Sequence, residues 1–545
     1  MGQALLVRPA IMLCTLNAKY IHASLALRYL LANMGELRAQ TALCEYTIAR
    51  RPADLAADLL ALLGPAEAGR VQVVGFGVYI WNVSQTCELV RLLKAARPAL
   101  KVVLGGPEVS HEHAQQAIVA LADHVITGWG DVSFPKLCRA LLHGPVPLMK
   151  VIAGEQPPLD ELALPYAEYS EADLAHRVLY VEASRGCPFK CEFCLSALDK
   201  TAWAFALEPF LAQLDQLYQR GARRFKFVDR TFNLKAEASA RILQFFLGRL
   251  PAEPLACALA PDLFVHFELI PDQLPERLKT LIAQFPTGVL QFEIGIQSFN
   301  PEVQQRISRR QDHAKTLANL GWLVTHSQAH LHTDLIFGLP GETLASFAEG
   351  FDTLYALRPH EIQLGLLKRL RGTPIARHTE PWGMVYDAEP PYAVQQTSVL
   401  SRDQGQRFVR LARYWDLVAN SGRFSRTLAL LMQGASPFAT FLAWSDWLWQ
   451  RSGQTSGLSP EQLVDHLFDY LTGPGAQPGQ DLQAVRDTVL GVLLADYLAS
   501  GARARPRALR PVLPAQGPPA ARSGAGLVPR QQQHALGANP PMIRP

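Results

Sequence analysis

Two series of alternating strand-like and helix-like segments run through most of this 545-residue chain. In the first series, short apolar runs and segments with helical periodicity follow one another at residues 11–16, 23–34, 71–80, 85–96, 101–104, 125–126 and 134–142. Strands that alternate with helices of this length predict a parallel sheet covered by helices on both faces. Ligands bind such sheets beyond the carboxyl ends of the strands. We therefore expect an α/β, doubly wound domain over residues 1–143.

A second series begins after residues 144–177, a Pro-rich and acidic stretch that we expect to be a linker. Its strand-like runs lie at residues 179–183, 224–229, 255–258, 290–296, 331–336 and 362–367, with helical segments such as 207–220 and 236–247 between them. Six consecutive βα units predict a partial (βα)6 barrel of the TIM type over residues 178–392. In such barrels the functional side chains lie at the carboxyl ends of the strands.

The pattern becomes helical over residues 393–500, which predicts an all-α domain. The clearest helical segments are residues 406–419, 438–450 and 484–498. In the first of them, Phe408, Leu411 and Trp415 have the spacing of a packing face. Three arginines lie off that face and are either solvated or positioned to hold an anionic substrate: Arg407, Arg410 and Arg413.

Residues 501–545 contain seven Arg, nine Pro and no Lys, Asp or Glu. Such a segment cannot bury enough apolar surface to fold, so we predict a disordered basic tail. An Arg-rich tail can contact nucleic acid or an anionic membrane, but a solvated end is the commoner case. The formal charge of +4 becomes −3 when this tail is left out. The globular part is therefore slightly acidic, which does not favour a nucleic-acid partner.

The eight cysteines are too few for a disulfide scaffold in a chain of this length. We find no run of about 18 uncharged apolar residues, so we expect no membrane span. The first residues lack the pattern of a secretory signal. These features predict a cytoplasmic protein, in which cysteines more often bind metal or catalyse than form disulfides.

Three of the cysteines, Cys187, Cys191 and Cys194, lie directly after the first strand of the expected barrel. Three thiolates at this spacing suit an iron–sulfur cluster whose fourth iron stays open for a ligand. A zinc site needs four ligands, usually in two pairs, and no His lies between Val181 and Ala206. A disulfide would leave one thiol unpaired. We therefore predict a [4Fe-4S] cluster.

The C-x3-C-x2-C spacing after the first barrel strand resembles the radical S-adenosylmethionine (SAM) superfamily. Residues 293–304 and 333–343 resemble the fourth-strand and fifth-strand motifs of the branch that includes the oxygen-independent coproporphyrinogen oxidase. The resemblance implies that the open iron chelates SAM and that an electron from the cluster cleaves it to methionine and a 5′-deoxyadenosyl radical. It also implies that Gln297, Arg309 and Asp334 hold the ribose and carboxylate of SAM. Arg suits a carboxylate, and Gln or Asp can bond hydroxyls.

The second strand departs from the superfamily pattern. Many relatives carry Gly-Gly-Glu there for the amino group of SAM, whereas this chain has Asp229 and Arg230 after Val228. The partner of the amino group is therefore not given by the resemblance, and backbone carbonyls could take this part.

The first series resembles the cobalamin-binding domain of cobalamin-dependent radical SAM proteins. Gly105 and Gly106 follow one strand and Gly77 ends another, and residues 128–131 read Gly-Trp-Gly-Asp. Small residues at strand ends leave room for a large ligand, although an empty or nucleotide-binding sheet remains the alternative. The family's D-x-H-x-x-G sequence is absent. His22 lies in the corresponding loop without its acidic partner and glycine, so we expect that it does not bind cobalt.

Together the resemblances imply a three-domain enzyme that uses cobalamin, SAM and a [4Fe-4S] cluster. The commonest reaction of such proteins is methylation of carbon: one SAM methylates the cobalamin, and a second yields the radical that activates the substrate. The alternatives are a radical cyclisation or rearrangement without methyl transfer, and a corrinoid-binding sensor or carrier. The implied partners are a small-molecule substrate and an electron donor of the flavodoxin or ferredoxin type. The C-terminal part resembles only a domain of unknown function that follows such barrels.

Overall fold

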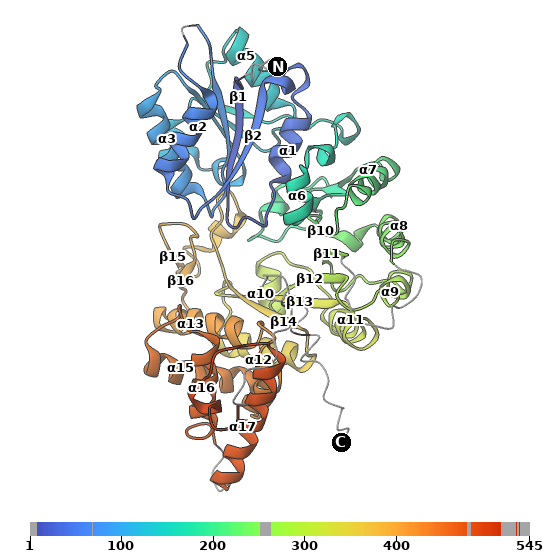
Figure 1. Cartoon of the computed structure of the whole chain (residues 1–545), viewed down its shortest axis with the longest axis vertical. Helices are drawn as coiled ribbons and strands as arrows, with labels where there is room; N and C mark the ends of the chain where they lie inside the picture. The colour runs from blue at the N-terminus through green and yellow to red at the C-terminus, as the bar shows by residue number, and fades with distance from the viewer. Residues whose placement is uncertain are drawn as a thin grey trace.

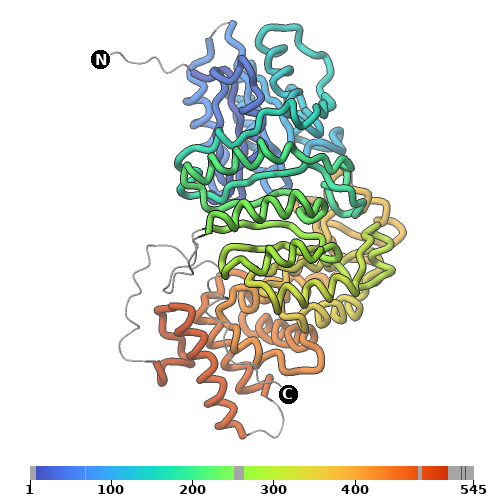
Figure 2. Tube along the Cα trace, turned by 90° about the vertical axis from the view of Figure 1, so that its right-hand side faces the viewer, coloured from blue at the N-terminus to red at the C-terminus, as the bar shows by residue number. Residues whose placement is uncertain are grey.

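The computed structural model describes residues 8–67, 69–250, 263–476 and 481–513, together with residues 530 and 534. Three parts follow one another along the long axis of the molecule (Figure 1). The N-terminal sheet lies at one end, the second sheet lies in the middle, and the C-terminal helices lie at the other end. Figure 2 shows the strands and helices of the middle part as successive layers between the two ends.

The N-terminal part is a six-stranded parallel sheet with the strand order β2-β1-β3-β4-β5-β6. Its strands are β1 (Ile11–Asn17), β2 (Thr41–Thr47), β3 (Val73–Gly77), β4 (Lys101–Gly105), β5 (His124–Thr127) and β6 (Val151–Ala153). The main helices are α1 (Leu25–Ala32), α2 (Pro52–Leu63), α3 (Val83–Ala96), α4 (Ala117–Leu121) and α5 (Ser133–His143). One apolar cluster packs α2, α3 and α4 on one face, and another packs α1 and α5 on the opposite face. The doubly wound prediction is thus confirmed.

The middle part is a second six-stranded parallel sheet, with the order β14-β13-β12-β11-β10-β7. Its strands are β7 (Leu179–Val181), β10 (Arg224–Phe227), β11 (Phe264–Leu269), β12 (Leu290–Gln297), β13 (His330–Phe337) and β14 (Glu361–Leu366). The covering helices are α7 (Leu207–Gln219), α8 (Ala236–Leu247), α9 (Glu276–Ile282), α10 (Pro301–Arg306), α11 (His313–His326) and α12 (Leu344–Ala356). Because β7 and β14 are both edge strands, the sheet is open, as the partial-barrel prediction requires.

Two strands differ from the sequence-based expectation. The strand expected at residues 255–258 lies outside the described residues, and β11 occupies the third position of the sheet instead. β6 lies within residues 144–177, which we expected to be a linker, and pairs with β5 at the edge of the N-terminal sheet. The remainder of that stretch includes α6 (Glu171–His176), which begins with a capping box at Ser170.

The C-terminal part is helical, as predicted. It consists of α13 (Arg402–Val418), α14 (Ser425–Leu431), α15 (Pro437–Ser452), α16 (Pro460–Leu471) and α17 (Leu482–Ala499). Phe408 and Trp415 of α13 are buried against the second sheet: Phe408 stacks on Phe337 at 4.0 Å between ring centroids, and the Trp415 indole donates to the carbonyl of Ile362 at 2.9 Å. The helices therefore share one apolar core with the barrel.

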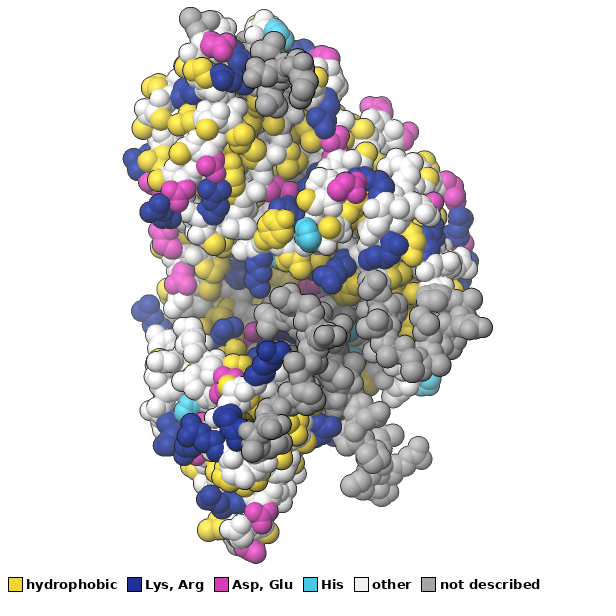
Figure 3. Space-filling view, in the orientation of Figure 1, with side chains coloured by type: hydrophobic (Ala, Val, Ile, Leu, Met, Phe, Trp, Pro, Cys, Tyr) yellow, Lys and Arg dark blue, Asp and Glu magenta, His cyan; other side chains and the backbone are white. Residues whose placement is uncertain are grey.

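The three arginines of α13 contact groups of the helical part itself. Arg407 pairs with Asp446 on α15, Arg410 lies over the ring of Trp449, and Arg413 donates to the carbonyl of Thr455. On the face that Figure 3 displays, Lys and Arg side chains are interspersed with acidic ones over the N-terminal part. None of the described helices is long and apolar enough to cross a membrane.

Residues 501–513 differ from the expectation of a disordered tail. A short 3-10 helix, Arg507–Leu509, packs on α16 and α17, and Leu509 is fully buried. Asp465 of α16 accepts hydrogen bonds from the backbone N–H groups of Arg507 and Ala508. Pro506 is buried as well, and Arg507 pairs with Asp469 of α16 at 2.7 Å. Residues 514–529, 531–533 and 535–545 lie outside the described part of the chain.

Candidate active site

The three predicted cluster cysteines lie in a loop that a small hairpin closes. Strand β8 (Ser184–Arg185) pairs antiparallel with β9 (Trp203–Ala204), and the loop leaves β8 at Gly186. The φ of Gly186 is +85°, and a Cβ there would lie 2.6 Å from Oγ1 of Thr201. Only glycine therefore fits this turn. The N–H of Cys187 donates to the carbonyl of Asp199 at 2.9 Å, which fixes the start of the loop.

Glu192, between the second and third cysteines, anchors the loop to the barrel. Its buried carboxylate accepts hydrogen bonds from Ser308 at 2.6 Å and from Arg377, and it pairs with Nε2 of His378 at 2.8 Å. Its backbone N–H donates to the carbonyl of Ile307 at 3.0 Å. Because these partners follow β12 and β14, they are more than 100 residues away in sequence, and the cysteine motif alone did not indicate them.

Burial and one nearby cation decide how readily the cysteine thiols lose their protons. Cys187 and Cys191 are buried, and Cys194 is half-buried. Burial raises the pKa values of the Cys187 and Cys191 thiols; at Cys191 the guanidinium of Arg309, 3.5 Å from Sγ, opposes the rise. A bound metal ion also lowers the pKa of a thiol and so favours the thiolate, as Arg309 does at Cys191. Three soft donors in one loop fit an iron–sulfur cluster with one open iron.

A cavity of about 580 Å³ lies within the second sheet, and two of the predicted SAM-binding residues line it: Gln297 and Asp334. Gln297 ends β12 with a φ of +73°, and Asp334 lies on the adjacent strand β13. Arg309 does not line this cavity. Its guanidinium donates to the carbonyl of Gly295 on β12 and so joins the strand to Cys191.

The lumen of the barrel contains both signs of charge. Burial alone would lower the pKa of His332, but its ion pairs with Asp334 at 3.2 Å and Glu361 at 3.6 Å outweigh burial and raise the pKa to about 10. Burial would raise the pKa of Glu293, but His266 at 3.3 Å and Lys226 at 3.4 Å hold it well below its usual range. Such a cavity can bind a polar ligand through charge-assisted hydrogen bonds.

A larger cavity of about 1030 Å³ lies between the N-terminal sheet and the cysteine loop. Three of the predicted glycines line it at the ends of β3 and β4: Gly77, Gly105 and Gly106. Gly106 has a φ of +107°, and a Cβ there would lie 2.5 Å from the carbonyl oxygen of Val78. At Gly105 the nearest atom to a Cβ would be the Ile126 carbonyl oxygen, at 3.7 Å. The opposite wall includes Leu195 near the cysteines and Arg230 after β10.

The Gly-Trp-Gly-Asp turn at residues 128–131 connects the two domains. The Trp129 indole donates to Asp199 at 2.9 Å, and Asp131 pairs with Arg185 of β8 at 2.9 Å. The Arg185 guanidinium also lies over the ring of Trp129. The Trp and Asp of this turn therefore fix the cysteine hairpin against the edge of the N-terminal sheet.

His22 lies where the two cavities meet, since it lines both of them together with Tyr180. Two further aromatic residues of the large cavity were not singled out as a pair from the sequence. Tyr79 and Trp81 stack at 4.4 Å between ring centroids with an interplanar angle of 6°, and the indole of Trp81 donates to the carbonyl of Leu16 at 3.2 Å. They form an apolar wall beside the ends of β1 and β3.

Three consecutive parts of the chain match described families. Residues 13–138 match the B12 binding domain, residues 181–354 match the Radical SAM superfamily, and residues 380–514 match a protein family of unknown function, DUF4080. The three matches follow the same order as the three structural parts.

Two curated methyltransferases are similar to most of the chain. The 2-(S-pantetheinyl)-carbapenam-3-carboxylate methyltransferase of Streptantibioticus cattleyicolor is 26% identical over 380 residues, which is 61% of this chain and 54% of that protein. The cobalamin-dependent radical SAM methyltransferase TokK of Streptomyces tokunonensis is 24% identical over 476 residues, which is 77% of this chain and 63% of that protein. The chain thus spans between about half and just under two thirds of the length of these relatives.

A solved structure supports the arrangement of the fold. The cobalamin-dependent S-adenosylmethionine radical enzyme OxsB, with aqua-cobalamin and S-adenosylmethionine bound, has a TM-score of 0.57 at 13% identity. The similarity covers 90% of this chain and 79% of that chain. The likeness is therefore one of fold across nearly the whole chain.

Proposed function

We propose that this chain, in which a B12-binding domain precedes a radical SAM domain and a C-terminal domain of unknown function, is a cobalamin-dependent radical SAM methyltransferase acting on a carbon atom of a small molecule. The observation that carries the proposal is the shared cavity of about 1030 Å³. Its wall combines Gly105 and Gly106 of the N-terminal sheet with Leu195 and Arg230 of the barrel. A group bound there touches both domains. Both curated relatives are methyltransferases.

Cys187, Cys191 and Cys194 would hold a [4Fe-4S] cluster, which supplies the electron for cleaving SAM when both are bound. The chain itself fixes the cysteine loop at two points. Glu192 joins the loop to residues after β12 and β14, and Arg309 joins Cys191 to Gly295. These contacts hold the three thiols in place before any cofactor arrives, which is the preorganisation that a site needs.

Gln297 and Asp334 would bind the ribose hydroxyls of SAM, because both line the lumen next to the loop. Asp334 already accepts a charge-assisted contact from His332 at 3.2 Å. That contact orients the carboxylate and leaves its other oxygen for a hydroxyl donor. Arg309 would bind the SAM carboxylate with the part of its guanidinium that faces Cys191.

The large cavity would hold cobalamin, which supplies the methyl group for transfer when bound. The glycines at the ends of β3 and β4 let the backbone approach a large ligand closely: Gly77, Gly105 and Gly106. The stacked rings of Tyr79 and Trp81 provide a flat apolar surface on the same wall. The fit is one of size and chemistry, since the cavity is roomy and mostly apolar.

The substrate would be a small molecule with polar groups, because the lumen of about 580 Å³ presents Lys226, Glu293 and His332 to its interior. A cytoplasmic electron donor of the flavodoxin or ferredoxin type would reduce the cluster. Cys194, the least buried of the three cysteines, would be the side of the cluster nearest to such a donor.

The test uses the full-length protein, reconstituted anaerobically with iron, sulfide and hydroxocobalamin, then reduced in the presence of SAM labelled on its methyl group. We expect both 5′-deoxyadenosine and S-adenosylhomocysteine, and a Cys191→Ala variant should form no 5′-deoxyadenosine. Formation of 5′-deoxyadenosine without S-adenosylhomocysteine would mean that the chain is a radical cyclisation or rearrangement enzyme and not a methyltransferase. If neither product forms, the chain is a corrinoid-binding sensor or carrier.

A further inference from the structure

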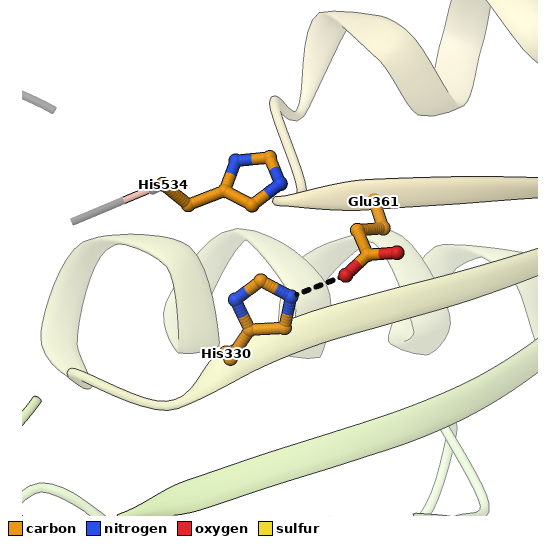
Figure 4. A group of neighbouring side chains, drawn as sticks. All are labelled: His330, Glu361 and His534. Atoms are coloured by element: carbon orange, nitrogen blue, oxygen red, sulfur yellow. Dashed lines mark hydrogen bonds and ion pairs between the residues drawn. The ribbon is translucent and has the colours of Figure 1, made fainter. Parts of the chain in front are cut away.

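A cluster of histidines and one carboxylate lies at the end of the barrel opposite to the cysteine loop. His330 is the first residue of β13 and Glu361 is the first residue of β14, so both lie at the amino-terminal ends of neighbouring strands. His534 of the C-terminal segment completes the group. The ligand atoms of the three residues all lie within 4.8 Å of one another. Figure 4 shows the three side chains converging on one point.

The two strand residues are buried and rigidly placed. Nε2 of His330 lies 2.9 Å from Oε1 of Glu361, and each side chain is only 5% exposed. A proton joins these two atoms, and a metal cation can displace it, as metal binding generally does at such donors. Because the register of the two strands fixes the backbone at both residues, a cation requires only small side-chain shifts that open the 2.9 Å contact.

The surroundings orient two of the three candidate ligands, Glu361 and His534. The second oxygen of Glu361 accepts from Arg530 at 3.1 Å and pairs with Nδ1 of His332 at 3.6 Å, which leaves Oε1 directed at His330. Nε2 of His534 forms a hydrogen bond at 3.1 Å with the backbone carbonyl of Asn420. The amide of Asn420 is in turn bonded to both the N–H and the carbonyl of Ile362 on β14. Hydrogen bonds of this kind to carboxylate and imidazole ligands are typical of metal sites.

A fourth side chain, His360, lies close to His330 but already forms a hydrogen bond with the backbone of β13. Its ring centroid is 4.6 Å from that of His330, and its Nδ1 accepts the backbone N–H of Leu331 at 3.1 Å. The proton of this neutral ring is therefore on Nε2, which cannot act as a ligand in that form. The remaining donor set is two imidazoles and one carboxylate, a set that zinc accepts at three-ligand sites.

We propose that His330, Glu361 and His534 form a zinc-binding site that ties the C-terminal segment to the floor of the barrel. The site is separate from the cysteine loop, because it lies at the amino-terminal strand ends and the cysteines lie at the carboxyl-terminal ends. It needs no cobalamin, SAM or iron. Its role is to hold His534, which is distant in sequence, against β13 and β14.

Zinc content is measured on the full-length protein loaded with cluster and cobalamin, so that the thiols are occupied by iron. We expect about one zinc per chain after dialysis against metal-free buffer. His534→Ala and Glu361→Gln should each remove it. The matched control is His360→Asn, whose side-chain oxygen can still accept the N–H of Leu331, and this variant should keep its zinc.

Further measurements test whether a loss of zinc reflects misfolding and whether zinc binds to the cysteines instead. Added zinc should raise the melting temperature of the wild-type protein but not of His534→Ala, whose circular dichroism should match the wild type. The triple variant of Cys187, Cys191 and Cys194 to Ala should still bind one zinc. The proposal is overturned if the wild type binds no zinc at micromolar concentration, or if His534→Ala binds as much. In that case Arg530 and His534 would be held against the barrel only by their hydrogen bonds to Glu361 and to the Asn420 carbonyl.

Discussion

Nδ1 of His22 lies 2.8 Å from the phenolic oxygen of Tyr180, and this contact joins the N-terminal sheet to the first strand of the barrel. The backbone of His22 also forms a parallel bridge with Val178, and its carbonyl accepts from the side chain of Asn17 at 2.8 Å. Burial lowers the pKa of His22, with Lys226 and Lys19 adding to the effect. The ring is therefore a neutral hydrogen-bonding group at the boundary between the two cavities.

This arrangement predicts that His22 does not coordinate the cobalt of a bound cobalamin. A nitrogen ligand on the axis of cob(II)alamin splits each cobalt line in the electron paramagnetic resonance spectrum. We expect no such splitting, because the loop around His22 lacks the Asp and Gly that would orient and accommodate an imidazole ligand. His22→Ala should leave the spectrum unchanged. Nitrogen splitting in the wild type that disappears in His22→Ala would make His22 a ligand.

The cysteine loop predicts the iron content. The reconstituted wild-type chain should contain about four irons, as expected of a cubane cluster. Replacing Cys187, Cys191 and Cys194 together by Ala should reduce the iron to background and abolish the broad thiolate-to-iron absorption. Cys87→Ala is the control, since this half-buried thiol lies on α3, away from the loop. A triple variant that keeps its iron would place the cluster elsewhere.

The large cavity predicts a size-dependent effect at Gly105. This glycine tolerates a side chain on the backbone, because a Cβ would meet only the Ile126 carbonyl oxygen at 3.7 Å. Gly105→Trp should fill the cavity and weaken hydroxocobalamin binding at least about tenfold, or about 1.4 kcal/mol. Gly105→Ala is the control and should bind normally. Gly106 is less suitable, because its positive φ strains any substitution. Equal affinity of the Trp variant and the wild type for hydroxocobalamin would show that cobalamin binds outside this cavity.

The sequence predicted the elements whose signal is local. The spacing of the three cysteines alone predicts an iron–sulfur cluster. Strands β1, β12 and β13 are recognisable in the sequence as apolar runs. Strand β11 was missed because its side chains alternate: His266 is turned to a lumen lined with charge, while Val265 and Phe267 lie in the core. The nearby apolar run at residues 255–258 resembled a buried strand more closely.

Contacts across long sequence separations could not be predicted. Glu192 contacts Arg377 and His378, and five further strands of the sheet lie between them along the chain. Trp129 and Asp131 looked like departures from a glycine-rich turn, yet they bind Asp199 and Arg185 across the domain boundary. Composition alone made residues 501–513 look like part of the tail, because two buried residues, Pro506 and Leu509, and a capping carboxylate leave no periodic signal.

The last prediction concerns Glu342, a buried carboxyl group in the turn after β13. Its Oε1 accepts a hydrogen bond from the hydroxyl of Ser298, and its Oε2 has no partner among the described residues. Burial raises the pKa of Glu342 to about 7, and the Ser298 hydrogen bond only partly opposes the rise. The folded protein therefore binds this proton more tightly than the unfolded chain, whose Glu titrates near pH 4.5.

The sign of the resulting pH dependence follows from linkage. A raised pKa in the folded state means that stability is fully present below about pH 4.5 and is lost as the pH rises through about 7. At one pKa unit per 1.36 kcal/mol, the loss approaches about 3 kcal/mol at pH 8.5. Glu342→Gln keeps the shape and the acceptor for Ser298 but has no charge to bury. Its free energy of unfolding, measured with urea, should match the wild type at pH 4 and exceed it at pH 8.5. Ser346→Ala, at a half-buried position in the first turn of α12, is the control. It removes the acceptor of the Asn300 amide and should change the free energy of unfolding equally at both pH values. A Gln variant that is no more stable than the wild type at pH 8.5 would mean that water or local rearrangement already solvates the charge.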